Sequence, residues 1–144
     1  MKKLALAAML AVGVTGVSMA EVDADAVIKY RKAAFTVAGW NMGTLGGMLK
    51  GEIEYSPEEA VAAAKRINEM AKAVGATFID GTYEGTKVNP KITDNRAEFD
   101  ADLAAFIEQS GAMVEAAGDK KTMAAQMGKL GGTCKSCHDA FKLD

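Results

Sequence analysis

Apolar residues recur three or four positions apart in four separate stretches of this sequence, and turn-forming residues separate the stretches. Such spacing places the apolar side chains on one face of an α-helix, where a neighbouring helix can cover them. Strand signals are nearly absent, because no run of β-branched residues alternates with polar ones. The pattern predicts an all-α chain folded as an antiparallel four-helix bundle with two short turns and one longer loop.

Each predicted helix has its own apolar stripe. The first stripe comprises Ile28, Arg31, Phe35, Ala38, Met42, Leu45 and Leu49. The second comprises Ala60, Ala64, Ile67, Ala71, Val74 and Phe78. The third comprises Phe99, Leu103, Phe106, Ser110, Met113 and Ala117, in a helix expected from about residue 94. The fourth comprises Met123, Met127, Leu130, Cys134, Cys137 and Phe141. Ser56 and Asp119 suit the N-cap positions of the second and fourth helices, and residues 80–93 read as a loop.

The first twenty residues have the features of a bacterial secretory signal. A cationic start, "MKK", precedes the apolar run "LALAAMLAVGV", and the small residues of "SMA" follow at residues 18–20. The apolar run is too short to span a bilayer, and no later stretch approaches eighteen consecutive apolar residues. We therefore expect a signal peptide at residues 1–20, a single domain at residues 21–144, a periplasmic location and no membrane anchor.

The charge balance argues against nucleic acid as a partner. The chain has 17 Lys and Arg against 19 Asp and Glu, which gives a formal net charge of −2. Its basic residues do not form a patch interleaved with aromatic ones, which is the usual footprint of a nucleic-acid-binding surface.

The whole stock of thiol and imidazole is gathered in "CKSCH", residues 134–138, because the chain has two cysteines and one histidine. On a helix, Cys137 lies about 60° to one side of Cys134 and His138 about 40° to the other. All three side chains therefore share the face expected to point into the bundle. C-x-x-C-H is the attachment sequence of c-type haem, with thioethers at both cysteines and His138 as the iron ligand.

Three other interpretations of this motif compete with haem attachment. Two periplasmic cysteines could form a disulfide, but this pair sits within one helical turn on a buried face. A thioredoxin-like redox pair lies at a helix N-terminus after a strand, whereas this pair lies near a helix C-terminus. A structural zinc site needs four ligands, and the chain has no second histidine or third cysteine.

Arg31 stands at an inward position of an otherwise apolar stripe. A guanidinium stays charged when buried, so it needs an anionic partner. One propionate of a haem would supply that partner through a charge-assisted hydrogen bond. The alternatives are that Arg31 reaches the edge of the bundle or pairs with a glutamate of a neighbouring helix.

The side of the haem opposite His138 decides what the iron can do. Without a second histidine, the sixth ligand is methionine, lysine, water or nothing. Phe35 lies one helical turn beyond Arg31 on the same face, and its ring cannot ligate iron. The sequence thus predicts a five-coordinate iron beneath an apolar, crowded distal side.

Four segments of the chain resemble the cytochromes c′, a family of four-helix-bundle c-type cytochromes. They are "DAVIKYRKAAF", "MLKG", "FIDGTYEG" and "GGTCKSCHDAFK". The resemblance covers essentially all of residues 21–144, and it implies one covalent haem c per chain. It also implies that family members are commonly homodimers, often through their first two helices.

The resemblance assigns further residues to the haem. Lys32 would lie along the haem edge beside Arg31, and Phe35 would occupy the distal position. Lys87, in a loosely aligned loop, would approach a propionate. Lys142, one turn after His138, matches a basic residue over the proximal face.

Two functions of different classes follow. The first is a non-enzymatic periplasmic haem protein that binds NO and CO at a five-coordinate, high-spin iron and can take part in electron transfer with an unidentified partner protein. The alternative is a six-coordinate, low-spin electron carrier with a methionine ligand. Met42 is the inward methionine of the first stripe, but it lies two turns from Phe35, roughly 10 Å along the helix axis.

Overall fold

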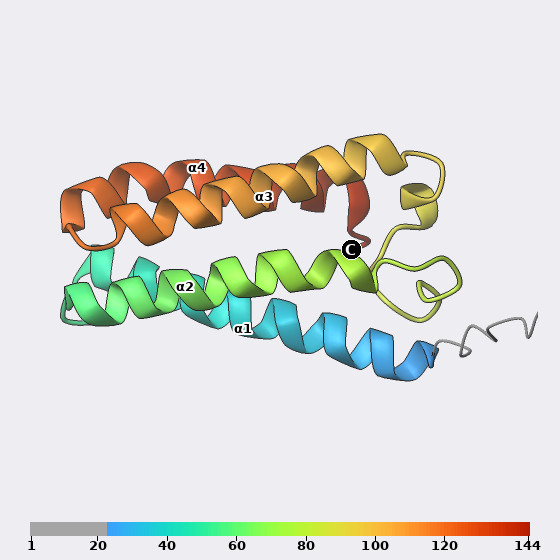
Figure 1. Cartoon of the computed structure of the whole chain (residues 1–144), viewed down its shortest axis with the longest axis horizontal. Coiled ribbons are helices and arrows are strands. Elements are labelled where there is room, and N and C mark those ends of the chain that lie inside the picture. The colour runs from blue at the N-terminus through green and yellow to red at the C-terminus, as the bar shows by residue number, and fades with distance from the viewer. Residues whose placement is uncertain (1–22) are drawn as a thin grey trace, which may run out of the picture.

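The computed structural model describes residues 23–144, so the expected signal peptide lies outside the described residues. Four helices make up the fold: α1 (Ala24–Lys50), α2 (Pro57–Val74), α3 (Arg96–Ala116) and α4 (Lys120–Phe141) (Figure 1). The connection between α2 and α3 contains two single-turn 3₁₀ helices, η1 (Gly75–Thr77) and η2 (Pro90–Ile92). Within residues 23–144 the β-structure amounts to one isolated bridge, so the predicted all-α bundle is confirmed.

Local capping fixes where the helices begin and end. Ser56 accepts a hydrogen bond from the Glu59 amide at 3.2 Å, and Asp119 accepts from the Thr122 amide at 2.9 Å. Both N-caps agree with the sequence prediction. Gly51 ends α1 with φ of 78°, a left-handed conformation that glycine adopts at little cost. Helix α3 begins at Arg96, two positions later than the sequence predicts.

The bundle pairs each helix with its neighbour in sequence. Helices α1 and α2, α2 and α3, and α3 and α4 pack along their lengths, whereas α1 and α4 touch at few positions. Both short turns, α1–α2 and α3–α4, lie at one end of the bundle, and the α2–α3 connection and the C-terminus lie at the other (Figure 1). We call these the closed end and the open end.

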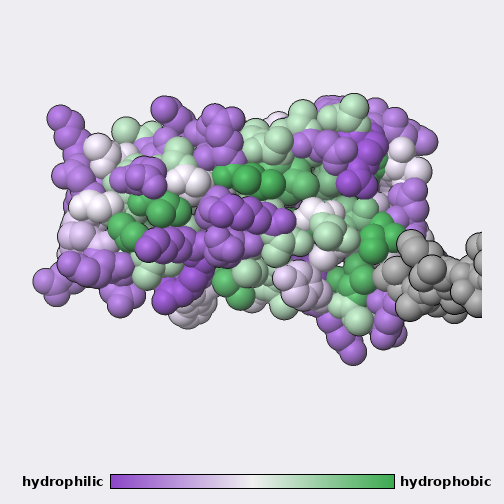
Figure 2. Space-filling model, viewed as in Figure 1, coloured by the Kyte–Doolittle hydropathy of each residue, from purple (hydrophilic) through white to green (hydrophobic). Residues whose placement is uncertain are grey.

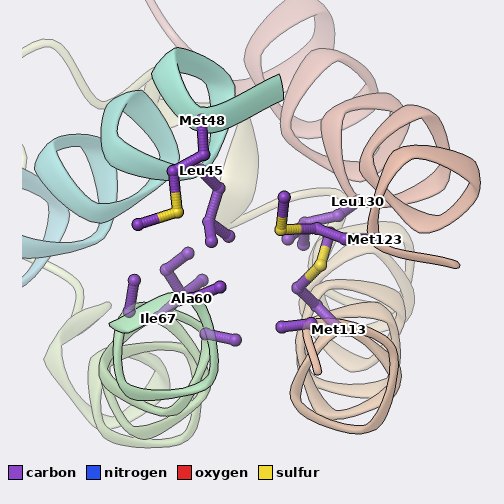
Figure 3. Packing of buried hydrophobic residues seen from close by; sticks show 10 residues of the cluster. Leu45, Met48, Ala60, Ile67, Met113, Met123 and Leu130 are labelled. Carbon is purple, nitrogen blue, oxygen red and sulfur yellow. The ribbon is translucent and has the colours of Figure 1, made fainter. Parts of the chain in front are cut away.

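Two hydrophobic clusters fill the bundle. The closed-end cluster consists mostly of small or flexible side chains: Leu45, Met48, Ala60, Ala63, Ala64, Ile67, Met113, Ala117, Met123 and Leu130 (Figure 3). The open-end cluster is largely aromatic: Ala34, Val74, Phe78, Tyr83, Ile92, Phe99 and Phe141. Every member of the second predicted stripe is buried, which confirms that assignment.

The buried face of α1 differs from the predicted stripe. Its buried residues are Arg31, Ala34, Ala38, Asn41, Leu45, Gly47 and Met48. Phe35 is 40% exposed, and Met42 and Leu49 are half-buried at the flank of that face. Helix α1 packs closely on α2 but hardly on α4, and the flank that carries Phe35 and Met42 lines the cavity between α1 and α4.

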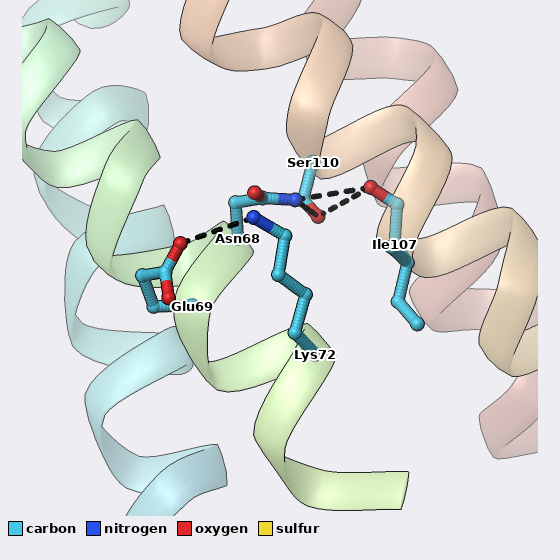
Figure 4. A network of polar contacts seen from close by, with 5 residues as sticks. All are labelled: Asn68, Glu69, Lys72, Ile107 and Ser110. Carbon is cyan, nitrogen blue, oxygen red and sulfur yellow. Dashed lines mark hydrogen bonds and ion pairs between the residues drawn. The ribbon is translucent and has the colours of Figure 1, made fainter.

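A polar contact joins α2 to α3 in the middle of the bundle. The side-chain amide of Asn68 donates to Ser110 Oγ at 2.9 Å and to the Ile107 carbonyl at 3.1 Å (Figure 4). Ser110 is fully buried, so losing these partners would leave polar groups without water. The contact favours one register of α2 against α3.

On the outer face of these two helices, hydrophilic side chains surround a narrow apolar strip (Figure 2).

Candidate haem site

A cavity of about 640 Å³ opens between α1 and α4 at the open end of the bundle. It lies where these two helices fail to pack on each other, and its walls are mainly apolar. Helix α1 contributes Phe35, Ala38, Gly39 and Met42 to its lining, and α3 contributes Phe99, Leu103 and Phe106. The α2–α3 connection and α4 complete it.

The residues of the C-x-x-C-H motif lie together on the α4 wall of this cavity. Cys134 and Cys137 are half-buried, and His138 is exposed at the mouth. All three line the cavity, as their helical spacing predicts. His138 also borders a smaller hollow beyond the mouth, lined by Asp139, Lys142, Leu143 and Asp144.

The environment of the thiols disfavours the redox-pair and zinc interpretations. Both cysteines are free, and burial, together with Asp102 and Cys134, raises the pKa of the Cys137 thiol to about 11. Burial also raises the pKa of Cys134. Thioredoxin-like chemistry needs the opposite, a thiol with a lowered pKa. Within residues 23–144, no three His, Cys, Asp or Glu side chains gather to hold a metal ion.

The surroundings of His138 favour the neutral form of its ring. Desolvation of part of its ring and the nearby Lys142 ammonium lower the pKa of His138, while Asp139 opposes this shift. The imidazole is therefore neutral at neutral pH, and a neutral ring nitrogen is the donor that binds iron.

Arg31 is almost fully buried, at 3% exposure, and donates to neutral acceptors of the α2–α3 connection. Its Nη1 bonds the Thr77 carbonyl at 2.6 Å and Thr82 Oγ1 at 3.1 Å, and its Nη2 bonds the Thr82 carbonyl at 2.6 Å. The guanidinium also lies 5.3 Å from the Phe78 ring and 5.7 Å from the Tyr83 ring. Arg31 therefore neither reaches the edge of the bundle nor pairs with a glutamate of a neighbouring helix, which were the two alternatives to a propionate contact. Its contacts leave donor capacity on the guanidinium, which lines the cavity.

Phe35 stands on α1 across the cavity from α4. Its ring meets Phe78 edge-on, with centroids 6.3 Å apart, and Phe78 continues into an aromatic series with Phe99 and Phe141. The contact with Phe78 fixes one side of the Phe35 ring, while the exposed part borders the cavity.

Lys32, Lys87 and Lys142, all exposed, also line the cavity. The structure thus brings together all eight residues singled out from the sequence. Lys142 is held by an antiparallel bridge to Val88. On either side of the bridge, the Leu143 amide donates to the Lys87 carbonyl and the Asn89 amide donates to the Phe141 carbonyl, both at 2.9 Å.

Sequence reasoning missed Asp102, the one carboxylate in the cavity lining described. One oxygen of Asp102 accepts a hydrogen bond from Ser136 Oγ at 2.9 Å, inside the C-x-x-C-H motif. A signal was available, because Asp102 lies next to Leu103 of the third stripe. Two of the three acceptors of Arg31, the carbonyls of Thr77 and Thr82, had no signal, since backbone carbonyls carry no side-chain pattern.

The cavity fits a c-type haem. Its volume is within the range of about 300–1,000 Å³ usual for cofactor sites. Two thiols and an imidazole lie on one wall, apolar side chains form most of the rest, and four basic side chains also belong to the lining. A four-helix bundle whose last helix carries C-x-x-C-H at such a cavity defines a bundle-type c-type haem protein.

Comparison with known proteins narrows this class to a family. The family model for cytochrome c′ matches residues 26–142, and the chain belongs to the cytochrome c′ family, whose members carry a covalently attached haem c. It is 35% identical to the cytochrome c′ of Cereibacter sphaeroides, covering 99% of both chains. The cytochrome c prime structure from Shewanella frigidimarina aligns with a TM-score of 0.81 and 31% identity, covering 86% of this chain and 99% of that one. A ferrous variant of the Alcaligenes xylosoxidans protein with bound NO aligns with a TM-score of 0.79 and 29% identity, covering 86% and 99%.

Proposed function

We propose that this protein is a gas-binding haem protein of the periplasm with a five-coordinate, high-spin iron. Cys134 and Cys137 form the thioethers, and His138 is the iron ligand. The observation that carries the proposal is the opposition of these three residues on α4 to Phe35 on α1 across one apolar cavity. Bound haem supplies an open iron coordination position and a one-electron redox centre.

The residues around the distal position favour NO and CO over O₂. The hydroxyls that line the cavity already donate to carbonyls: Thr36 to Lys32, Thr86 to Tyr83, and Thr133 to Leu130. O₂ gains much of its haem affinity from a distal hydrogen-bond donor, whereas NO and CO depend on it far less. The NO-bound structure of the Alcaligenes relative supports the same ligand class.

The basic residues at the edge have distinct roles in this proposal. Arg31 offers its remaining donors to one propionate, and Lys32 and Lys87 extend along the exposed haem edge. Lys142 lies one turn after His138 and places a positive charge on the proximal side. Its bridge to Val88 supports that role, because it fixes the backbone that carries the ammonium.

Location and assembly complete the proposal. Residues 1–20 act as a signal peptide that directs the chain to the periplasm, and no helix among residues 23–144 is long and apolar enough to cross a bilayer. The outer side of α1 exposes Tyr30, Val37 and Trp40, the last at 78%. Large apolar side chains in such positions favour a homodimer in which α1 is covered by a second copy. The protein takes part in electron transfer and needs no catalytic residue of its own.

A second candidate remains, a low-spin electron carrier with Met42 as sixth ligand. The observation in its favour is that Met42 lines the same cavity as His138. Against it stands the position of Phe35, which lies two turns closer to the start of α1 and beside Arg31.

Rapid mixing of the reduced protein with CO tests the gas-binding proposal. The Phe35→Ala variant is expected to bind CO about tenfold faster than the wild type, equivalent to about 1.4 kcal/mol of barrier. The matched control is Val37→Ala, because Val37 lies on the outer side of α1. Equal rates in wild type and Phe35→Ala would remove Phe35 as the steric barrier. A Met42→Ala variant that gains CO binding absent from the wild type would favour the second candidate.

A further inference from the structure

Three exposed lysines from three different elements meet at the mouth of the cavity. Lys32 comes from α1, Lys87 from the α2–α3 connection, and Lys142 from the residue that follows α4. Within residues 23–144, none of the three forms an ion pair with a carboxylate. Their ammonium groups therefore remain available to an outside partner.

The charge at the mouth is opposite to that of the whole chain. The cavity lining holds four cationic residues, including the buried Arg31, against the single carboxylate of Asp102. The complete chain has 17 basic and 19 acidic residues. Like charges held close together repel one another, so this cluster is stabilised by anions that approach the mouth. Arg31 is buried at 3% exposure, whereas the side chains of all three lysines are exposed.

Nearby carboxylates neutralise this surface only in part. Asp139 pairs with Lys135 on the outer side of α4, and Asp144 borders the hollow beside Lys142. The Leu143 amide, one residue before Asp144, donates to the Lys87 carbonyl at 2.9 Å, so Asp144 lies beside the backbone of Lys87 as well as next to Lys142. Neither acid forms an ion pair with any of the three lysines.

The centre of this surface is apolar. The half-buried Val88 lies among the lysines, within a cavity lining that is mainly apolar. An apolar centre with a charged rim is the usual composition of a protein–protein interface. On the basis of the electron-transfer role proposed above, we propose that Lys32, Lys87 and Lys142 form a docking surface for a redox partner protein with an acidic patch. The partner's carboxylates orient it so that an electron crosses at the mouth.

The test uses the purified, haem-loaded chain and two oxidants of opposite charge. The reduced protein gives one electron to anionic hexacyanoferrate(III), which becomes hexacyanoferrate(II), or to cationic tris(phenanthroline)cobalt(III), which becomes the cobalt(II) complex. Neither reaction moves a proton or breaks a bond. Rates are measured at low and high salt for the wild type, for Lys32→Glu/Lys87→Glu, and for Lys120→Glu/Lys121→Glu. The last double variant has the same net charge, but its changes lie at the closed end.

We expect Lys32→Glu/Lys87→Glu to slow the oxidation of the reduced protein by hexacyanoferrate(III) about tenfold at low salt. Its oxidation by the cobalt complex should become faster, and both effects should fade at high salt. The closed-end control is expected to change both rates much less. Poly-L-glutamate, a macromolecular carboxylate probe, should slow oxidation of the wild type and the control but not of the mouth variant.

Equal effects in the two double variants would overturn the docking surface, because only net charge would then act. The Lys32→Gln/Lys87→Gln variant gives a second test. If its absorption spectrum changed while the salt dependence of its oxidation rates stayed that of the wild type, the docking surface would be overturned in favour of contacts between the lysines and the propionates. Failure of the wild type to react with either oxidant would instead remove the electron-transfer role itself.

Discussion

The two ends of the bundle are built from the same four helices but from different side chains. At the closed end, alanines of α2 and methionines of α3 and α4 are buried between the helices. At the open end, phenylalanines and a buried arginine replace them, and α1 and α4 hardly touch. Small side chains allow helices to approach closely, whereas bulky ones and a long connection hold them apart. The comparison assigns stability to the closed end and cofactor binding to the open end.

Removal of both cysteines should have the largest effect on the open end. The Cys134→Ser/Cys137→Ser variant is expected to lose all covalently bound haem, because no other cysteine can form a thioether. Haem staining of the denatured protein on a gel measures this loss. Haem that stayed attached through denaturation in the double variant would contradict the assigned site.

A cavity made at the closed end should separate stability from the haem. Leu45 is fully buried, so Leu45→Ala is expected to lower the free energy of unfolding by about 2–5 kcal/mol. Because Leu45 lies outside the cavity lining, the absorption spectrum of the folded variant should match that of the wild type. Denaturant unfolding and the visible spectrum check the two halves of this prediction. The exposed Lys129→Ala change on α4 serves as the control for stability, and a shifted spectrum in Leu45→Ala would show that the two ends are not independent.

The bridge at the open end should make a smaller contribution. Leu143→Pro removes the amide that donates to Lys87, and Lys142 already has the extended backbone that a following proline requires. We expect a loss of about 1 kcal/mol and faster hydrogen exchange at the Asn89 amide, measured by NMR. Leu143→Ala keeps the amide and is the matched control. Equal exchange at Asn89 in both variants would show that the bridge does not hold the C-terminus.

Local signals explain how much of this structure could be predicted from sequence. The caps Ser56 and Asp119 act within one helical turn, so the starts of α2 and α4 were predictable. The spacing of Cys134, Cys137 and His138 placed them on one face for the same reason. For α1 the predicted stripe contains the buried Arg31, Ala38 and Leu45, and packing against α2 sets the remaining rotation of the helix.

Long-range contacts account for what the sequence left open. Arg31 was recognised as anomalous, but its acceptors are 46 and 51 positions away, two of them backbone carbonyls. The bridge between Val88 and Lys142 likewise joins two backbone segments whose side chains carry no pairing pattern. The structure supplies these contacts, and they connect α1, the α2–α3 connection and the end of α4 around the cavity.

The central claim is an open coordination position between His138 and Phe35 at the open end. The most direct test is the visible absorption spectrum of the dithionite-reduced protein before and after CO is added. The account predicts a broad high-spin spectrum that sharpens when CO binds. A sharp, split α/β spectrum that CO leaves unchanged would contradict it, because a side chain such as Met42 would already fill the position.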